Sequence, residues 1–142
     1  SIDFAAGARQ ARTIGTRGAV LLQNNGALPL SGDLKSVVLI GKASQVYAQQ
    51  AVAGGAVVGE PMGAGGGSSD VVPNYTVTPI EGLRNSLSGA ASVKLILVDD
   101  ENATATVDGR KVSFAEALAE AGKAEAVVMM AGTIAEEGAD RA

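Results

Sequence analysis

The chain has 142 residues, of which 46% are hydrophobic, 3% aromatic and 18% charged, and its formal net charge is −4. This composition is typical of a globular domain, and the acidic balance argues against a nucleic-acid or anionic-membrane partner, because no basic patch is available to neutralise phosphates. The sequence has no cysteine and no histidine, which excludes disulfides, thiolate nucleophiles, Fe–S and Cys-zinc sites and histidine chemistry within this chain, and leaves carboxylates, Lys, Tyr, Ser and Thr for catalysis.

A helix is expected at the start of the chain. Residues 3–17 repeat apolar side chains near helical spacing, with Asp3 as the N-cap. The apolar run at 19–22 predicts a short strand, and the Asn-Asn-Gly sequence at 24–26 predicts a turn. Because the chain starts at Ser1 without a methionine and shows no signal peptide, we expect a processed product, an engineered piece or a fragment.

Three continuous apolar runs, rich in β-branched residues, predict strands buried on both faces, as in a parallel sheet. They lie at 36–40, 93–98 and 126–130. Two capping boxes, at 78–81 and 113–116, predict helices between these strands, because each pairs a Ser or Thr N-cap with a Glu three residues later. The expected apolar stripes of the two helices are Ile80, Leu83 and Leu87, and Phe114, Ala117, Leu118 and Ala121.

The order of these elements predicts an α/β fold. With a tight hairpin turn at 107–110, the chain runs strand, long loop, helix, strand, hairpin, helix, strand, which is a βαβαβ pattern with right-handed crossovers. In such folds the ligand crevice lies outside the carboxyl ends of the parallel strands. Two loops leave that edge, 41–78 and 132–142, so candidate functional residues are expected there.

The first of these loops contains a glycine-rich stretch at 63–70. Glycines let a backbone approach a ligand closely and expose its N–H groups. As a nucleotide signature the stretch is weak, because its spacing is not G-x-G-x-x-G and no Walker lysine follows. Two interpretations of these residues stay open, a surface loop and a loop that binds a ligand.

The second loop gathers acidic residues at the carboxyl end of the third strand. Glu136, Glu137, Asp140 and Arg141 lie within six positions. One interpretation is a solvated acidic turn with a surface ion pair, worth at most ~1 kcal/mol. The other is a positioned carboxylic acid for proton transfer.

Several motifs, taken together and in order, resemble family 3 glycoside hydrolases. The chain is similar to the VLLKN…LPL sequence that begins the second domain of that family, and to its EG-x-DR motif. The matching segments are 17–24, 28–30, 38–41, 66–69, 78–83 and 137–141. Each motif is short, but their order covers nearly the whole chain.

The resemblance implies an α/β fold, a three-layer sandwich with a mostly parallel sheet, which we expect to be incomplete in this chain. Residues 1–30 correspond to a helix and linker that enter the domain, and residues 31–142 to the N-terminal portion of the sandwich. In the family, a barrel precedes the sandwich and carries an Asp nucleophile, and this barrel is not part of the sequence.

The resemblance also implies roles for the acidic loop. Glu137 stands immediately before the glycine of EG-x-DR, the position of the general acid/base, and Glu136 is the fallback. A retaining glycosidase needs two carboxyls about 5–5.5 Å apart, one a nucleophile and one an acid with a raised pKa. Asp140 and Arg141 match the motif and are expected to hold the loop.

The glycine-rich loop gains a role from the same resemblance. In the family its position faces the bound sugar, which points here to Gly67, Ser68 and Ser69 as substrate-binding residues. Since the sugar lies between barrel and sandwich, the expected partners are a carbohydrate substrate and the remainder of the polypeptide. No cofactor, metal ion, nucleic acid or membrane is expected, and the family favours a periplasmic or extracellular location.

The function implied is part of a retaining β-glycosidase, exo-acting and β-glucosidase-like, that hydrolyses β-linked glucosides. This chain would supply the general acid/base loop and one wall of the sugar site, and would be inactive alone because the nucleophile lies elsewhere. The alternative is a non-catalytic α/β binding module that uses the glycine-rich loop for a phosphorylated ligand.

Overall fold

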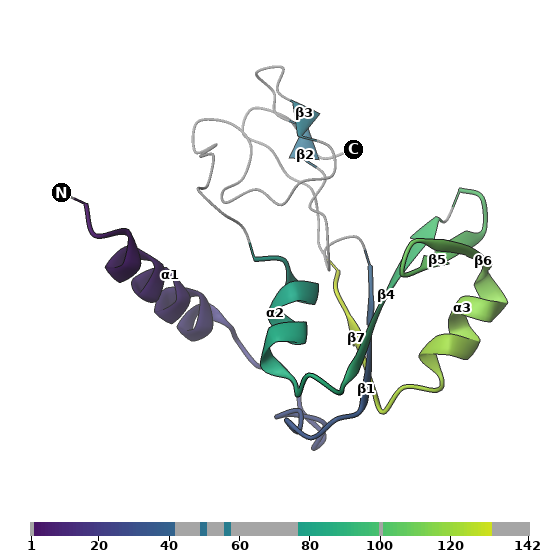
Figure 1. Cartoon of the computed structure of the whole chain (residues 1–142), viewed down its shortest axis with the longest axis horizontal. Helices are drawn as coiled ribbons and strands as arrows, with labels where there is room; N and C mark the ends of the chain where they lie inside the picture. Colours follow the sequence, from purple (N-terminus) through teal and green to yellow (C-terminus); the bar gives the residue numbers. More distant parts are fainter. Residues whose placement is uncertain (1, 42–48, 51–55, 58–76, 100, 132–142) are drawn as a thin grey trace. The chain divides into compact units, whose positions relative to one another are not determined.

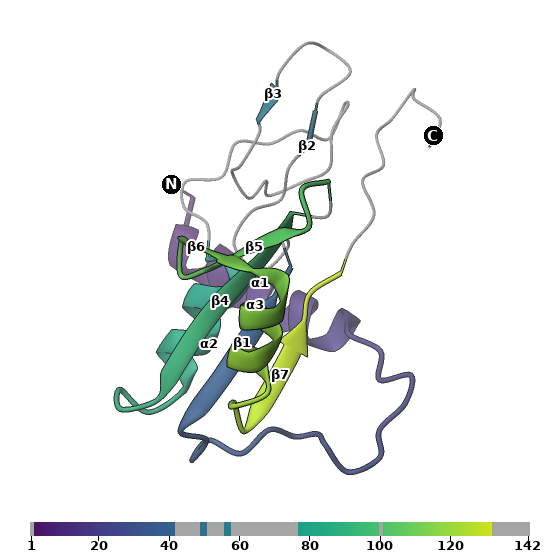
Figure 2. The same ribbon diagram turned by 90° about the vertical axis from the view of Figure 1, so that its right-hand side faces the viewer.

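A computed structural model describes residues 2–41, 49–50, 56–57, 77–99 and 101–131 of the chain (Figures 1 and 2). The chain divides into two compact units, Ser1–Leu30 and Ser31–Ala142. Within the described ranges, no helix is long and apolar enough to cross a membrane.

The first unit contains helix α1, Phe4–Gly18. Its N-cap is Asp3, whose carboxylate accepts a hydrogen bond from the backbone N–H of Ala6 at 2.9 Å. This bond satisfies one of the backbone donors that every helix leaves unpaired in its first turn. The predicted helix and its cap are confirmed, and the helix ends one residue beyond the predicted boundary.

The strand predicted at 19–22 is wrong. These residues belong to no helix or strand, and the side chains of Val20, Leu21 and Leu22 are 77%, 62% and 92% exposed. A short apolar run forms a strand only where another strand pairs with it, and no strand in the described part of the chain does so. The turn that follows is confirmed, since the Asn24 side chain accepts hydrogen bonds from the N–H groups of Gly26 and Leu28.

The second unit is built on a mixed sheet with the strand order β6-β5-β4-β1-β7 among the described residues. The strands are β1 Ser36–Ile40, β4 Ser92–Asp99, β5 Thr104–Val107, β6 Arg110–Ser113 and β7 Ala126–Met129. The central strand β1 pairs in parallel with β4 on one side and β7 on the other, which confirms the three predicted strands and the α/β class. The predicted hairpin joins the same sheet as antiparallel β5 and β6, so the parallel part is its β4-β1-β7 half.

Two further short strands, β2 Gln49–Gln50 and β3 Ala56–Val57, pair antiparallel with each other. They lie in the segment between β1 and the next helix, which the sequence predicts as one long loop.

Both predicted capping boxes begin helices. Helix α2, Pro79–Ser86, starts where the Thr78 hydroxyl accepts from the Glu81 N–H at 3.3 Å and the Glu81 carboxylate accepts from the Thr78 N–H at 3.0 Å. Helix α3, Phe114–Ala121, starts with the same reciprocal pair between Ser113 and Glu116. Each box satisfies two donors of a helix end.

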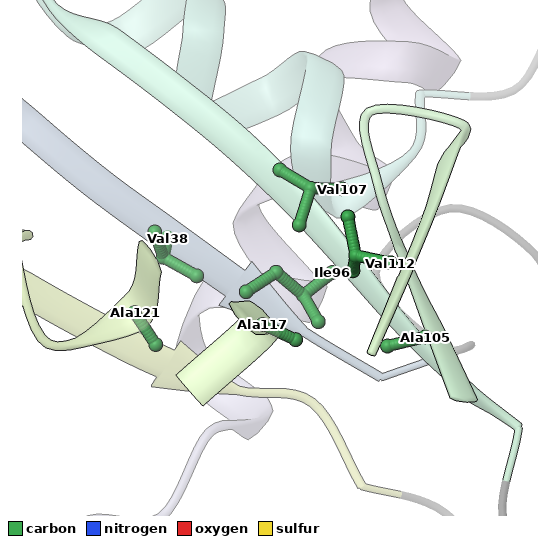
Figure 3. Packing of buried hydrophobic residues seen from close by; sticks show 7 residues of the cluster. All are labelled: Val38, Ile96, Ala105, Val107, Val112, Ala117 and Ala121. Atoms are coloured by element: carbon green, nitrogen blue, oxygen red, sulfur yellow. The ribbon is translucent and has the colours of Figure 1, made fainter. Parts of the chain in front are cut away.

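The two helices lie on opposite faces of the sheet, as Figure 1 shows. On one face, Ala117 and Ala121 of α3 pack over side chains of four strands (Figure 3), namely Val38, Ile96, Ala105, Val107 and Val112. On the other face, Ile80 of α2 packs over Val37, Leu39, Val93 and Leu95. Because neighbouring strand residues point to opposite faces, both faces of β1 are buried, and the result is the expected three-layer sandwich.

Candidate functional site

The carboxyl ends of β1 and β7 lie side by side. The backbone N–H of Met130 donates to the carbonyl of Ile40 at 2.8 Å, and the N–H of Gly41 donates to the carbonyl of Ile96 on β4 at 3.0 Å. The chain therefore leaves the sheet after Gly41 and after Met130 at neighbouring positions on one edge. This is the edge at which ligands bind in open α/β sheets.

Gly41 makes the closest approach at this edge. Its φ is +113°, a conformation that residues with a side chain rarely adopt. A Cβ atom placed on Gly41 would lie 2.2 Å from the carbonyl oxygen of Met130. The position therefore requires glycine both for its backbone conformation and for its contact with β7.

The sequence-predicted site residues all lie outside the described residues. Gly67, Ser68 and Ser69 belong to the segment that follows Gly41, and Glu136, Glu137, Asp140 and Arg141 to the segment that follows Met130. The structure shows the two residues, Gly41 and Met130, after which these segments leave the sheet.

The chain distance from the described edge to the predicted acid is short. Glu137 follows the last described residue, Ala131, by six positions. An extended chain spans at most ~3.3–3.6 Å per residue, so six residues reach about 20 Å.

The surroundings of three described glutamates disfavour a role as general acid. Hydrogen bonds from the backbone N–H groups of Thr78 and Ser113 lower the pKa of Glu81 and of Glu116 below its usual value. Side-chain hydrogen bonds from Lys123 and Lys94, at 2.6 and 2.7 Å, lower the pKa of Glu120 to about 2. A general acid needs the opposite shift, toward the working pH, so these carboxylates serve as caps and ion-pair partners.

A hollow of about 500 Å³ lies beside the β4–β5–β6 part of the sheet. It is lined by Leu97, Asp99, Glu101, Thr104, Thr106 and Lys111, among others. The sequence interpretation did not point to these residues, although the alternation of threonines with buried Ala105 and Val107 could have marked a polar sheet face. Asp99 is engaged locally, since it accepts hydrogen bonds from the backbone and side chain of Asn102.

In the part of the chain that the structure describes, no three Asp, Glu, His or Cys side chains lie close enough together to bind a metal ion. The hydroxyls, carboxylates and ammonium group around the hollow can form hydrogen bonds with a polar ligand.

Comparisons with known proteins agree with the fold. A family model described as "Glycosyl hydrolase family 3 C-terminal domain" matches residues 19–142. A protein described as "Beta-glucosidase" from Rhizobium radiobacter is 39% identical over 83 residues, which are 58% of this chain and 9% of that protein. No solved structure matches the chain. Since the family match covers most of the sequence, the chain belongs to the family of glycosyl hydrolase family 3 C-terminal domains.

Proposed function

We propose that this chain is part of a retaining β-glycosidase, exo-acting and β-glucosidase-like, to which it contributes the general acid/base loop and one wall of the sugar site. The observation that carries the proposal is the family match over residues 19–142, which includes the Glu137–Arg141 motif. The similarity to a β-glucosidase over 83 residues supports it. So does the paired exit of the two candidate segments at the carboxyl edge of the sheet.

In this proposal Glu137 carries the proton. It protonates the glycosidic oxygen as the leaving group departs, and in the second step it takes a proton from the water that hydrolyses the glycosyl-enzyme intermediate. Gly67, Ser68 and Ser69 contact the sugar. Asp140 and Arg141 hold the acid loop in place, Asp140 as an acceptor and Arg141 as a fork of donors.

The nucleophile comes from another part of the polypeptide, as the length of the β-glucosidase relative suggests, since the match spans only 9% of that protein. A carboxylate nucleophile nearby raises the pKa of the acid, because two like charges at short distance are unfavourable. Desolvation by the bound sugar raises it further. The chain by itself holds one half of the carboxyl pair and is therefore inactive without the barrel and the rest of the sandwich.

Substitution of Glu137 by Gln in the complete enzyme tests the assignment. General acid catalysis contributes about 10²–10⁴-fold, so turnover of glycosides with poor leaving groups should fall by this factor. Aryl glycosides with acidic phenols should lose much less in the glycosylation step, because they leave without a proton. The basic limb of the pH profile should disappear, and added azide should restore turnover by replacing the base-activated water.

The same substitution at Glu136 is the control. Glu136→Gln should keep the leaving-group dependence and the pH profile of the parent enzyme. If Glu136→Gln shows the azide rescue and Glu137→Gln does not, the acid is the neighbouring residue. If neither variant shows it, the acid lies outside this loop and the loop is only a wall of the site.

A further inference from the structure

We propose that Gly41 is a positioning residue of the glycosidase, which fixes where the segment carrying the acid/base leaves the sheet. The inference rests on the proposed function of Glu137. Gly41 touches no substrate in this proposal. It acts through its contact with the backbone of Met130, from which the chain runs on to Glu137.

The contact between Gly41 and Met130 is accompanied by two backbone hydrogen bonds. The carbonyl oxygen of Met130 lies 2.2 Å from the point that a Cβ of Gly41 would occupy, and the carbonyl carbon of Met130 lies 3.3 Å from it. The N–H of Met130 is bonded to the carbonyl of Ile40, and the N–H of Gly41 is bonded to the carbonyl of Ile96. The Met130 peptide at the end of β7 therefore occupies the space that a side chain at position 41 would fill.

No other glycine in the described part of the chain combines these two features. Gly109, in the turn between β5 and β6, has a φ of +82°, and Gly26 has a φ of +99°, but neither has a heavy atom within 4 Å of a built Cβ. Gly122 has a backbone oxygen at 3.4 Å and an ordinary φ. Among the described glycines, only Gly41 joins a positive φ to a close approach of a second strand.

An alanine at position 41 has to displace the Met130 peptide. Real Cβ atoms essentially never lie within 3.0 Å of another heavy atom, so the peptide moves by roughly 1 Å in a close-packed interior. The atoms in the way belong to the Met130 backbone, which cannot rotate away as a flexible side chain could. A displacement of about 1 Å at a reacting group can cost on the order of 10²-fold in rate, and Glu137 is six positions beyond Ala131.

Gly109→Ala supplies a matched control for Gly41→Ala. Both variants place an alanine at positive φ and pay the same kind of conformational cost, but only the alanine at position 41 meets β7. The complete enzyme is the protein to test. In Gly41→Ala, kcat/KM for a glycoside with a poor leaving group should fall about 10²-fold, with a much smaller loss for an aryl glycoside with an acidic phenol.

The basic limb of the pH profile should also shift in Gly41→Ala, because that limb reports the environment of the acid. Gly109→Ala should lower the melting temperature while leaving both the leaving-group ratio and the pH profile unchanged. A loss that is equal in the two glycine variants, or that is the same for both leaving groups, would overturn the inference.

Combination with Glu137→Gln separates this inference from the proposed function. If Gly41 acts through the acid, Gly41→Ala adds little to the loss already present in Glu137→Gln. A full additional loss in the double variant overturns the positioning role. If Glu137→Gln itself keeps the normal leaving-group dependence and pH profile, the proposed acid is wrong, whatever Gly41→Ala does.

A second variant decides the matter if Gly41→Ala does not yield folded enzyme. Ala131→Gly adds backbone freedom immediately after Met130, on an exposed residue. The backbone after β7 then gains conformational freedom without any steric clash. The ratio of kcat/KM between acidic and poor leaving groups should rise several-fold in this variant, and an unchanged ratio would overturn the inference.

Discussion

Ser36 and Glu125 hold each other's backbone at the amino ends of β1 and β7. The N–H of Glu125 donates to both the carbonyl and the hydroxyl of Ser36, at 3.1 and 3.0 Å. The carboxylate of Glu125 in turn accepts hydrogen bonds from the N–H groups of Lys35 and Ser36. The side chains of Ser36 and Glu125 thus connect β1 and β7 at their amino ends. At the carboxyl ends, Gly41 contacts Met130.

Replacement of Glu125 by Ala should remove the hydrogen bonds that its carboxylate accepts from Lys35 and Ser36. Two backbone donors at the start of β1 lose their acceptor, which should lower the free energy of unfolding by about 0.5–1.5 kcal/mol. Glu125→Gln keeps one acceptor oxygen and should lose less. Denaturant titration of the two variants checks the difference, and an unchanged stability of Glu125→Ala would show that these two hydrogen bonds do not stabilise the fold.

The Ser113 cap should contribute a similar amount. Ser113→Ala removes the hydroxyl that accepts from the Glu116 N–H, and the loss of such an N-cap costs ~1 kcal/mol. Ser113→Thr keeps a hydroxyl and is the matched control, with an expected loss of a few tenths of a kcal/mol. Urea midpoints of the two variants provide the measurement, and a Thr variant as unstable as the Ala variant would contradict the role of the hydroxyl.

The helices and buried strands could be predicted because their signals are local. The N-cap and its glutamate are three residues apart in both boxes, at Thr78 and at Ser113, and the hydrogen bonds form within those four residues. The run at 36–40 is apolar on both faces because both faces are covered. These patterns depend little on what the rest of the chain does.

Where the outcome depends on distant partners, the sequence was less informative. The apolar run at 19–22 has strand character but no strand pairs with it in the described part of the chain. Phe114 and Leu118 belong to the predicted stripe of α3, yet 46% and 55% of their surfaces are exposed. The small side chains of Ala117 and Ala121 face the sheet instead, because packing against the strands decides which part of the stripe is covered.

In the candidate site, too, local motifs could be predicted from the sequence and contacts between distant residues could not. Gly41 can be recognised in the sequence as the end of a strand, but its contact with Met130 joins residues that are far apart in the chain and follows from the parallel register of β1 and β7. A strand that is apolar on both faces has no alternating pattern that would fix this register. The motif around Glu137, by contrast, is local and could be recognised, and its role remains a proposal because it lies outside the described residues.

The ion pairs of Glu120 predict a dependence of stability on pH. Bonds from Lys123 and Lys94 lower its pKa from 4.5 to about 2 in the folded chain. The unfolded chain therefore binds more protons between these values, so the stabilisation is full above about pH 4.5 and is lost as the pH falls toward 2. The stability difference between the parent protein and Glu120→Gln should shrink over this window in urea titrations.

Glu101→Gln is the control for that window. The Glu101 carboxylate forms no hydrogen bond or ion pair with other described residues, so Glu101→Gln removes no such contact and should change the urea midpoint little. If Glu120→Gln differs from the parent by the same amount at pH 2 and at pH 6, the lysine contacts of Glu120 do not stabilise the folded state.

The glycine-rich stretch at 63–70 is proposed to contact the sugar. If the segment after Gly41 lines the sugar site, Ser68→Val in the complete enzyme removes a hydroxyl that hydrogen-bonds the sugar and should raise KM or lower kcat/KM. Loss of one such hydrogen bond costs about 0.5–1.5 kcal/mol, which corresponds to a few-fold to tenfold effect. The melting temperature should change little. Ser88→Val is the control, since Ser88 is exposed in the turn before β4, at the opposite edge of the sheet. Unchanged kinetics of Ser68→Val across several β-glucosides would remove this loop from the sugar site while leaving the role of Glu137 to its own test.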